Sequence, residues 1–522
     1  MGSATALTTA RSRLHSLFRA HGAATEAAHR PARRSVWLLA LAVVALAAAC
    51  VPPENPNAPN PAGLTTTLRS GAIDLEWATT LGGTSFGYEV QFTSATTPWT
   101  TFATTTEPWV SFTDVTPLTS YSFRVRDGAA PGAPAKVWSP QVTVVYVEPK
   151  LPVLRIDTTG RAPILDRENY VRATMTLDPN GSGFAPYTGT LDIRGRGNTT
   201  WLAPKKPYRL RLDTKSALMG IASNRHWALL ANYNDKSQLR TYAAGEVSRA
   251  TDLDFTPAYR HVEVILNGKY EGVYQLTEHI RTGADRIDIE EMGPEDNSGV
   301  ELTGGYLLEV DERLEENHEP GFRTQRHVPV VVKEPDPMTP EQRAYISGHV
   351  AAFENALFSP SYADPTLGYR RYLDETAFAD HYLVHEIARN QDTFFSSTFF
   401  SKQRGDDRFV FGPMWDFDLS MGVVGAPRTL DPTGWAQRTS GPWIARIFTD
   451  PTFVTTVEQR WAALAPQIAD LPDRIEALGD SLQPAIDNDE ARWGYQLDQH
   501  DSPQYVADWL RTRLGWIGGE LD

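Results

Sequence analysis

The 522-residue chain has a single cysteine, no uninterrupted apolar run of membrane-spanning length, and fewer basic than acidic residues. One cysteine excludes a disulfide within the chain. An ordinary transmembrane helix needs about 20 consecutive apolar residues, so no stretch predicts such a span. The formal net charge of −15 argues against sequence-independent binding to nucleic acid, which requires a basic surface. It leaves room for a small anionic ligand in a local basic pocket.

The single cysteine, Cys50, ends an N-terminal segment with the order of charges and apolar residues found in export signals. Arginines precede the apolar run Val36–Ala49, and a proline-rich polar stretch at 51–62 follows the cysteine. The run is as long as the apolar region of a signal peptide and too short to span a bilayer. It resembles a bacterial lipoprotein signal, in which the cysteine becomes the lipidated first residue. We therefore expect a signal peptide at 1–50 and an extracytoplasmic protein anchored to the cell membrane by a lipid on Cys50. The alternative is a plain secretory signal and a secreted protein.

A chain of this length predicts two or three domains, and residues 63–147 have the pattern of a small β-sandwich. After the semi-extended linker at 51–62, short segments with alternating apolar residues, such as "GYEVQFTS" and "QVTVVYV", are separated by turn residues. Trp77, Tyr88 and the segment "PLTSYSFRVRDG" resemble a fibronectin type III domain, in which a tryptophan fills the core and a tyrosine, here Tyr121, fixes a strand corner. We expect this domain to be a spacer.

The remaining chain changes its hydrophobic period at about residue 340. Segments such as "LPVLRID", "GTLDIRGRG" and "PYRLRLD" indicate strands from 151 to about 339, whereas "YLDETAFADHYLVHEIARN" is typical of the helices expected from 340 to 520. A strand-rich part followed by a helix-rich part predicts a two-lobed α+β domain. The cleft between the lobes is the expected ligand site.

Two aspartates occur at alternate positions in "FGPMWDFDLSMG", surrounded by apolar residues. If this segment is a strand, Asp416 and Asp418 point to the same side. Two neighbouring carboxylates repel each other, and burial is costly for both. Either both face water, or a positive group lies between them.

A turn with two glycines and a following pair of lysines suggests a phosphate-binding element. The segment "LDIRGRGNTTWLAPKKPYRLRLD" puts the turn 194–201 between two predicted strands, and Lys205 and Lys206 enter the second strand. N–H groups at Gly195 and Gly197 can approach phosphate oxygens closely, and a strand lysine adds a fixed positive charge. A hairpin with solvent-exposed lysines has the same pattern.

Asp392 follows a predicted helix and precedes an aromatic run in "HEIARNQDTFFSSTFFSKQ". A carboxylate at this position can activate a hydroxyl or a water, although a loop aspartate at the end of the helix is the simpler interpretation. His381 and His385 lie four residues apart on one helix face, a spacing that zinc sites use. No third ligand is evident, so we expect core or surface histidines.

Taken together, these segments resemble the spore coat protein H (CotH) kinase family. Six blocks occur in the order of that family: "IRGRGNTTW", "KKPYRLRLD", "HWALLANYNDKSQLR", "VEVILNGKYEGVYQLTEHI", "KEPD" and "GPMWDFDLSMG". The resemblance covers residues 151 to 520. It implies an atypical protein kinase that transfers phosphate from ATP to serine or threonine with Mg²⁺ or Mn²⁺.

The resemblance also implies which residues bind the nucleotide. Lys206, or its neighbour Lys205, would pair with the phosphates, and Glu278 would orient that lysine as a helix glutamate does in ordinary kinases. The rest of the implied nucleotide-binding set lies in the glycine-bearing turn: Arg194, Gly195, Gly197 and Asn198.

In the same way, the resemblance implies Asp392 as the catalytic aspartate and Asp416 as the metal ligand, with Asp418 as a second candidate. Ordinary kinases have a metal-binding asparagine five residues after the catalytic aspartate, where this chain has Ser397. A hydroxyl is a poorer magnesium ligand than an amide carbonyl. The departure puts a second metal ion in question and, to a lesser degree, activity.

The sequence thus predicts a membrane-tethered protein kinase that acts on surface or secreted proteins, binds no nucleic acid and is a monomer. Such a kinase needs ATP, which is scarce outside a bacterial cell. The alternative is a catalytically inactive kinase fold that serves as a surface adhesion or carbohydrate-associated module. Four tryptophans would suit sugar stacking: Trp201, Trp415, Trp435 and Trp443. A glycosidase that uses Asp392 with Asp416 would require a carboxyl separation that the sequence does not give. A binding module needs neither aspartate, whereas a kinase fails without either.

Overall fold

A computed structural model describes residues 63–69, 71–78, 87–129 and 135–521. The predicted signal peptide, Cys50 and the linker at 51–62 lie outside these ranges. Within the described ranges, no helix has the length and apolar character needed to cross a membrane.

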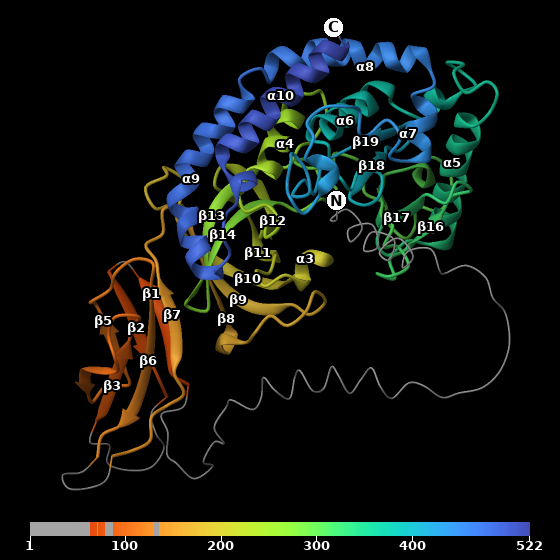
Figure 1. Cartoon of the computed structure of the whole chain (residues 1–522). Coiled ribbons are helices and arrows are strands. Elements are labelled where there is room, and N and C mark those ends of the chain that lie inside the picture. Colours follow the sequence, from red (N-terminus) through yellow and green to blue (C-terminus); the bar gives the residue numbers. More distant parts are fainter. Residues whose placement is uncertain (1–62, 70, 79–86, 130–134, 522) are drawn as a thin grey trace, which may run out of the picture. The chain divides into compact units, whose positions relative to one another are not determined.

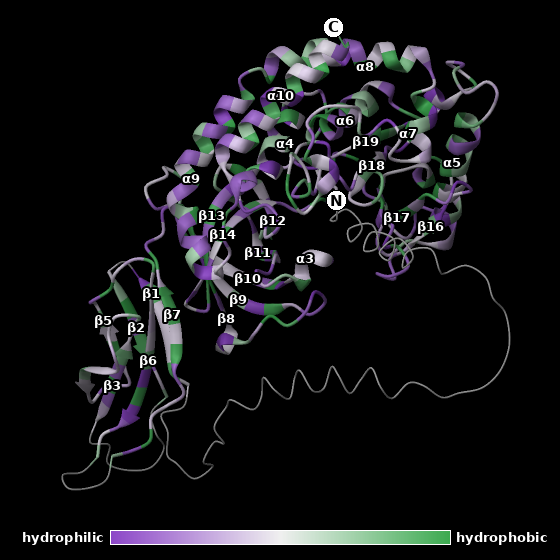
Figure 2. Cartoon of the chain, in the orientation of Figure 1, coloured by the Kyte–Doolittle hydropathy of each residue, from purple (hydrophilic) through white to green (hydrophobic). Residues whose placement is uncertain are grey.

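Two antiparallel sheets form the N-terminal part of the described chain (Figure 1). The first has the order β1-β2-β5, and the second has the order β4-β3-β6-β7. Hydrophobic and hydrophilic residues alternate along these strands, as Figure 2 shows, because side chains of a strand point alternately to its two faces. The strands are β1 (Thr65–Arg69), β2 (Ala72–Glu76), β3 (Tyr88–Thr93), β4 (Thr100–Thr105), β5 (Trp109–Phe112), β6 (Thr119–Asp127) and β7 (Val142–Tyr146).

The aromatic residues singled out in the sequence lie in the core of this part. Trp77 and Tyr88 are buried and meet edge to face, with ring centroids 5.2 Å apart. The hydroxyl of Tyr121 accepts a hydrogen bond from the N–H of Thr116 at 2.9 Å. The prediction that Tyr121 fixes a strand corner is therefore confirmed.

Seven strands after the sandwich close into a barrel with the order β10-β11-β12-β14-β13-β8-β9. All neighbours pair antiparallel except β13 and β8, which are parallel. Inward-facing residues of β10 and β11, such as Leu191 and Leu210, are buried, whereas four charged residues face outward: Asp192, Arg194, Arg209 and Arg211. The strands are β8 (Val153–Thr158), β9 (Val171–Asp178), β10 (Tyr187–Gly195), β11 (Tyr208–Leu218), β12 (Ile221–Leu230), β13 (Tyr259–Leu266) and β14 (Lys269–Glu278).

A five-stranded sheet follows the barrel and has the order β16-β17-β15-β18-β19. It contains strands from both sides of the predicted boundary between the strand-rich and helix-rich parts. Its middle strand β15 is buried at every residue, so both of its edges need hydrogen-bonding partners. One partner, β17, precedes residue 340, and the other, β18, follows it. The expected division of the chain at 339/340 is therefore incomplete. The strands are β15 (Tyr306–Val310), β16 (Gly321–Arg323), β17 (Pro329–Glu334), β18 (Thr398–Lys402) and β19 (Phe409–Phe411).

Helices α4 to α10 pack with this five-stranded sheet around the largest hydrophobic core, whereas α3 has no buried residue. Their starts follow ordinary capping rules: Thr339 caps α5 in a capping box with Gln342, and Asp374 caps α6 by accepting from the N–H of Ala377. The helices are α3 (Thr199–Leu202), α4 (Arg240–Arg249), α5 (Pro340–Leu357), α6 (Glu375–Ala388), α7 (Pro442–Ile447), α8 (Pro451–Leu464), α9 (Leu471–Trp493) and α10 (Pro503–Leu521).

A buried ion pair joins α9 to the barrel, beside β14 (Figure 1). The ammonium of Lys205 lies 2.8 Å from a carboxylate oxygen of Asp489, and both side chains are 1% exposed. Lys205 also donates to the carbonyl of Val273, whose N–H donates to Asp489. A second pair, Arg492 with Glu271, lies 3.2 Å apart. Burial lowers the pKa of Lys205 and Asp489 opposes this effect, so the lysine depends on its partner to stay charged.

We expect Lys205→Met to lower the free energy of unfolding by about 3–5 kcal/mol, because it leaves the carboxylate of Asp489 buried without a counter-charge. Lys206→Met is the matched control. Among the described residues, the ammonium of Lys206 donates to the carbonyl of Trp201 alone, so its loss should cost about 1 kcal/mol. Urea unfolding followed by tryptophan fluorescence measures both, and equal losses would contradict the structural role of Lys205.

Candidate functional site

One cavity of about 290 Å³ brings together segments that are far apart in the sequence. Its walls come from the turn 194–200 after β10, the loop 230–234 after β12, the segment 309–319, the loop 392–399 and the segment 415–419. Three of these five segments include residues for which the sequence predicted a role: 194–200, 392–399 and 415–419.

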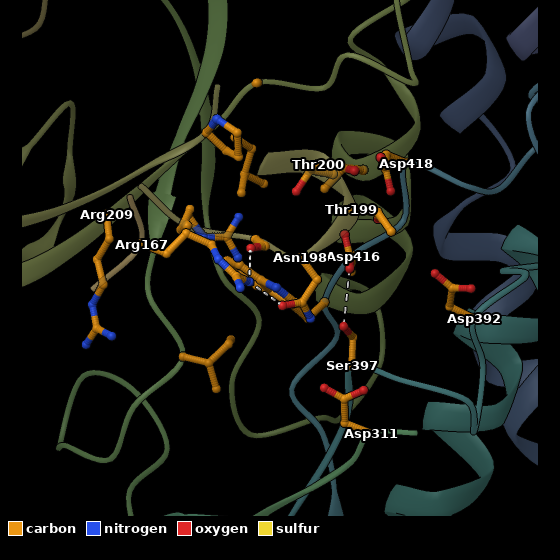
Figure 3. Close-up of a pocket in the computed structure, with 18 of the residues that line it drawn as sticks. Arg167, Asn198, Thr199, Thr200, Arg209, Asp311, Asp392, Ser397, Asp416 and Asp418 are labelled. Carbon is orange, nitrogen blue, oxygen red and sulfur yellow. Dashed lines mark hydrogen bonds between the residues drawn. The ribbon is translucent and has the colours of Figure 1, made fainter. Parts of the chain in front are cut away.

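Opposite charges occupy different sides of this cavity. Figure 3 shows Arg209 at one side, Asp392, Asp416 and Asp418 at the other, and Asn198 between them. All five residues line the cavity. The arrangement suits a ligand that carries both negative groups and a bound cation.

Asp416 and Asp418 lie in an irregular segment rather than in the expected strand. Strand β19 ends at Phe411, and Pro413, which has no N–H to donate to a sheet, soon follows. Asp416 has a φ of 66°, in the left-handed region, so strand alternation does not set the direction of either side chain. Both aspartates nevertheless line the cavity.

Hydrogen bonds from two other segments hold these aspartates. The hydroxyl of Ser397 donates to a carboxylate oxygen of Asp416 at 3.2 Å, and the side-chain amide of Asn234 donates to Asp418 at 3.0 Å. The side-chain amide of Asn390 donates to the main-chain carbonyl of Asp416 at 3.2 Å. The predicted metal residues Asp416, Asp418 and Ser397 are therefore brought together.

Three of the aspartates that line the cavity, Asp392, Asp416 and Asp418, repel one another. Burial raises the pKa of Asp418 to about 8; the negative charge of Asp416 adds to the rise, and the hydrogen bond from Asn234 opposes it. Burial likewise raises the pKa of Asp392 to about 6, with further contributions from Asp416 and Asp311. Such shifts in a cavity are typical of functional sites, where neighbouring charges are held close.

Arg196, in the glycine-bearing turn, supplies part of the missing positive charge. Burial lowers its pKa, whereas the attraction of Asp416 and Asp418 raises it. Its guanidinium lies 5.3 Å from the ring centroid of Trp415, and within the described chain it forms no hydrogen bond to either aspartate. The two aspartates thus have a positive charge nearby, but Arg196 is not bonded to either of them within the described chain. The sequence analysis did not single out Arg196, although it lies between the two glycines of "RGRGN".

The two glycines of this turn have different roles. Gly197 has a φ of 80° and lines the cavity. The N–H of Gly195 instead donates to the carbonyl of Asp166 at 2.9 Å, and a Cβ at this position would lie 2.5 Å from the ring of Trp201. Packing requires Gly195, and the prediction that its N–H faces a phosphate is wrong. Arg194, which was predicted to bind the nucleotide, lines the cavity.

Neither predicted lysine is free to pair with a phosphate. The ammonium of Lys205 is bonded to Asp489 and Val273, although the residue lies at the cavity wall. Lys206 lies outside the cavity lining and donates to the carbonyl of Trp201 at 2.6 Å. We therefore correct the assignment of a phosphate-binding lysine, since both ammonium groups have partners elsewhere.

Glu278 is also engaged elsewhere. It ends strand β14, forms an ion pair with Arg286 and accepts a hydrogen bond from the N–H of Ala258 at 2.7 Å. It lies outside the cavity lining. The prediction that Glu278 orients a lysine is therefore wrong, because a strand end with its own arginine replaces the expected helix glutamate.

Asp392 lies in a loop that is fixed to the preceding helix. Helix α6 ends at Ala388, and Thr393 pairs its hydroxyl with the Nδ1 atom of His385 at 2.8 Å. His381 and His385 are buried, and burial lowers the pKa of both. They are core histidines, as expected, and His385 positions the loop that carries Asp392.

A second acidic group in the cavity was missed by the sequence analysis. Carboxylate oxygens of Glu309, Asp311 and Glu319 lie within 4.8 Å of one another. Lys333 is 3.3 Å from Glu309 and 3.1 Å from Glu319, and burial raises the pKa of Glu309 to about 7. The alternating acids of "YLLEVDERL" and the lysine of "VVVKEPD" were the available signals.

The tryptophans considered for sugar stacking are used inside the protein. Trp415 and Trp443 are 6% and 1% exposed. Trp435 meets Trp516 edge to face, and Trp201 packs against Gly195. This packing argues against an exposed aromatic platform.

A cavity with clustered aspartates, a loop aspartate after a helix, and a facing glycine-bearing turn with arginines is the site expected of a kinase-like protein. The family model described as CotH kinase protein matches residues 193–517, and the chain belongs to this family.

Solved structures give weaker similarity. Titin kinase with its flanking domains is 12% identical with a TM-score of 0.15, over 43% of this chain and 38% of that chain. The Caenorhabditis elegans twitchin kinase region is 10% identical with a TM-score of 0.17, over 83% of this chain and 79% of that chain. The chicken CNTN1 FN1–FN3 domains are 14% identical with a TM-score of 0.16, over 32% of this chain and 64% of that chain. These scores carry no argument about the fold, and the chain spans under half of the titin structure. No curated protein matches the chain.

We expect Asp418→Asn to raise the thermal midpoint of the chain in EDTA at about pH 9 by about 1–4 °C, because above its raised pKa of about 8 Asp418 is a third ionised carboxylate beside Asp416 and Asp392, and asparagine keeps a side chain that can bond Asn234. Added Mg²⁺ should stabilise the wild type more than the variant. Differential scanning calorimetry with EDTA and with Mg²⁺ measures both effects. A lower midpoint for the variant in EDTA would show that repulsion is not the dominant effect at this residue.

Proposed function

We propose that the chain is an atypical protein kinase that transfers the γ-phosphoryl group of ATP to a serine or threonine hydroxyl. The observation that carries this proposal is the single cavity in which Asp392, Asp416 and Asp418 face the arginine-bearing turn. Membership in the CotH kinase family supports it. Phosphoryl transfer requires mainly positioning and charge neutralisation, and a cavity with segregated charges provides both.

The donor atoms around Asp416 fit a hard divalent cation. Carboxylates of Asp416 and Asp418 would be the ligands of Mg²⁺ or Mn²⁺, and the hydroxyl of Ser397, now bonded to Asp416, would be a weaker third. When bound, the cation would neutralise phosphate charge. The raised pKa of Asp418 fits this interpretation, since the aspartates lack a directly bonded counter-charge within the described chain.

Arg196 and the turn that carries it would hold the phosphates. Arginine stays charged when partly buried and offers several donors to phosphate oxygens, so it suits this task better than a lysine already paired. Gly197 and Asn198 line the same wall, and within the described residues their main-chain N–H groups form no hydrogen bond. They could therefore approach a phosphate directly.

Asp392 would receive the proton of the acceptor hydroxyl. The hydroxyl oxygen forms a bond to the γ-phosphorus while the bond from that phosphorus to the bridging oxygen breaks, and ADP leaves. The hydroxyl proton passes to the carboxylate of Asp392. A pKa of about 6 keeps this group mostly ionised at neutral pH while making it a stronger base than an ordinary aspartate.

We further propose that the barrel and the helix-bearing part act as the two lobes of the kinase, and that the chain works outside the cytoplasm as a monomer, anchored through a lipid on Cys50. Its substrates would be surface or secreted proteins. The order of charged and apolar residues before Cys50 supports this location.

ATP with Mg²⁺ or Mn²⁺ should raise the thermal midpoint of the purified full chain, because a ligand that binds only the native state stabilises it by about 2.7 kcal/mol at a hundred times its dissociation constant. Asp416→Ala should abolish the metal-dependent part of the shift. Asp392→Asn should keep the shift and reduce labelled-phosphate transfer by at least about a hundredfold. No shift with any nucleotide and metal would rule out the kinase, and glycan binding would be tested next.

Arg196→Met should weaken ATP binding by about tenfold or more, because it removes the cation between the turn and the aspartates. Lys206→Met is the matched control and should leave binding unchanged, since its ammonium donates to Trp201. Titration calorimetry with ATP and Mn²⁺ measures both affinities. The reverse result would restore a lysine as the phosphate ligand.

A further inference from the structure

Two neighbouring cross-strand pairs on the outer face of the barrel differ in charge. Asp192 of β10 is directly opposite Arg211 of β11, and a hydrogen bond of 2.7 Å joins them. Two residues along, Arg194 is directly opposite Arg209. Like charges directly opposite each other destabilise a sheet, so this second pair needs a compensating anion.

The described chain does not supply that anion. Neither guanidinium of this pair forms a hydrogen bond or ion pair within the described residues, and the Nε atoms of Arg194 and Arg209 are buried without a partner. Burial lowers the pKa of Arg209 to about 10, and its neighbours Arg194, Arg281 and Arg196 lower it further. A half-buried cation surrounded by cations is costly unless a ligand balances it.

The positive charge continues from this pair into a second cavity of about 230 Å³. Lys215, Arg225 and Arg281 line that cavity with two acids, Asp285 and Glu291. Lys215 and Arg225 are exposed and form no ion pair within the described chain. We call Arg194, Arg209, Arg281, Arg225 and Lys215 the basic row.

A histidine that lines the second cavity responds to the charge of the basic row. His226 of β12 is directly opposite Arg211 of β11. Its Nε2 atom lies 3.4 Å from a nitrogen of Arg281, and its Nδ1 atom is buried without a partner within the described residues. Burial lowers its pKa to about 4, and Arg281 and Arg209 contribute. The basic row therefore extends from Arg194 and Arg209 at the first cavity to Arg281, Arg225 and Lys215 at the second, and of these five residues Arg281 is paired with Glu334 at 3.6 Å.

The basic row includes residues that lie outside the first cavity, which contains the candidate metal ligands Asp416 and Asp418. Arg196, attracted by Asp416 and Asp418, already serves the phosphates beside the metal residues. Lys215 and Arg225 line only the second cavity, so a nucleotide held at Asp416 gives no reason for them. On a chain with a net charge of −15, a basic row attracts an acidic partner while the rest of the surface repels it.

We propose that the basic row binds the acceptor of the phosphoryl transfer, and that this acceptor is an acidic polypeptide segment. This inference rests on the proposed kinase function, since only a phosphoryl transfer has an acceptor. Carboxylate or phosphate groups flanking the acceptor hydroxyl compensate Arg194 and Arg209 near the first cavity and Lys215 and Arg225 in the second. The hydroxyl then lies toward Asp392, and the acidic flank lies along the row.

Binding of fluorescent peptides to the full chain in EDTA, without nucleotide, tests the row separately from catalysis. The peptides carry one serine flanked by Asp and Glu, by phosphoserine, by Gln, or by Lys. Fluorescence anisotropy should give a dissociation constant about tenfold or more lower for the acidic peptides than for the Gln peptide, with weaker binding at high salt. A lower value for phosphoserine than for carboxylate flanks identifies phosphate as the anion, and the reverse identifies carboxylate.

The variant Lys215→Ala/Arg225→Ala should lose this preference and raise the KM for an acidic peptide substrate, with the ATP-induced thermal shift unchanged. Both side chains are exposed, so the fold should persist. Arg371→Ala/Arg408→Ala removes the same charge from exposed side chains that line neither cavity, and it should behave as the wild type. Equal affinity for acidic and Gln peptides, or unchanged binding in the first variant, would overturn the basic row. Peptide binding without any ATP-induced shift would instead overturn the kinase and leave the row as an acidic-peptide site.

Discussion

Repulsion among Asp392, Asp416 and Asp418 is the constraint on which the arrangement of the cavity depends. Two of the three carboxylates are held by hydrogen bonds from other segments: Ser397 bonds Asp416, and Asn234 bonds Asp418. These bonds come from opposite parts of the chain, so the barrel side and the helix side must both be in place before the aspartates meet. The left-handed backbone of Asp416 adds a local cost of the kind found at functional sites. The site therefore uses stability supplied by the surrounding core to keep charges together that would otherwise separate.

Local patterns in the sequence predicted the strand-rich and helix-rich segments and the aromatic core of the sandwich, because alternation and helical period are properties of neighbouring residues. They did not predict how strands pair across the chain. The fully buried strand β15 takes a partner from each side of residue 340, and nothing near Tyr306–Val310 indicates that β18 is one of them. The prediction of a strand at residues 415–418 was wrong for a different reason. The alternation of this segment is typical of a strand, but Pro413 and the left-handed Asp416 end the regular backbone.

The structure brings the predicted aspartates together in one cavity, whereas both predicted lysines and Glu278 have partners elsewhere. A carboxylate at the cavity is identified by its apolar surroundings in the sequence, whereas the task of a lysine or arginine is decided by its partner. Lys205 forms an ion pair with Asp489, and Glu278 forms one with Arg286. Arg196 and Arg209 remain without a carboxylate bonded to them within the described chain, and this property is visible only after the strands are paired. Unpaired charge, more than residue type, is the property on which our proposals for these arginines rest.

The ion pair between Lys205 and Asp489 also makes closure of the barrel depend on the order in which the chain is synthesised. Its two residues are 284 positions apart, so a ribosome that adds about 5–20 residues per second makes the second partner roughly 15–60 s after the first. During that interval Lys205 would be buried either as an unpaired ammonium or, since burial lowers its pKa, as a neutral amine, and both states oppose closure of the barrel. A chain that stops before α9 lacks the partner of Lys205, so closure of the barrel that carries the turn with Arg196 is favoured most in molecules that have been made almost to the end.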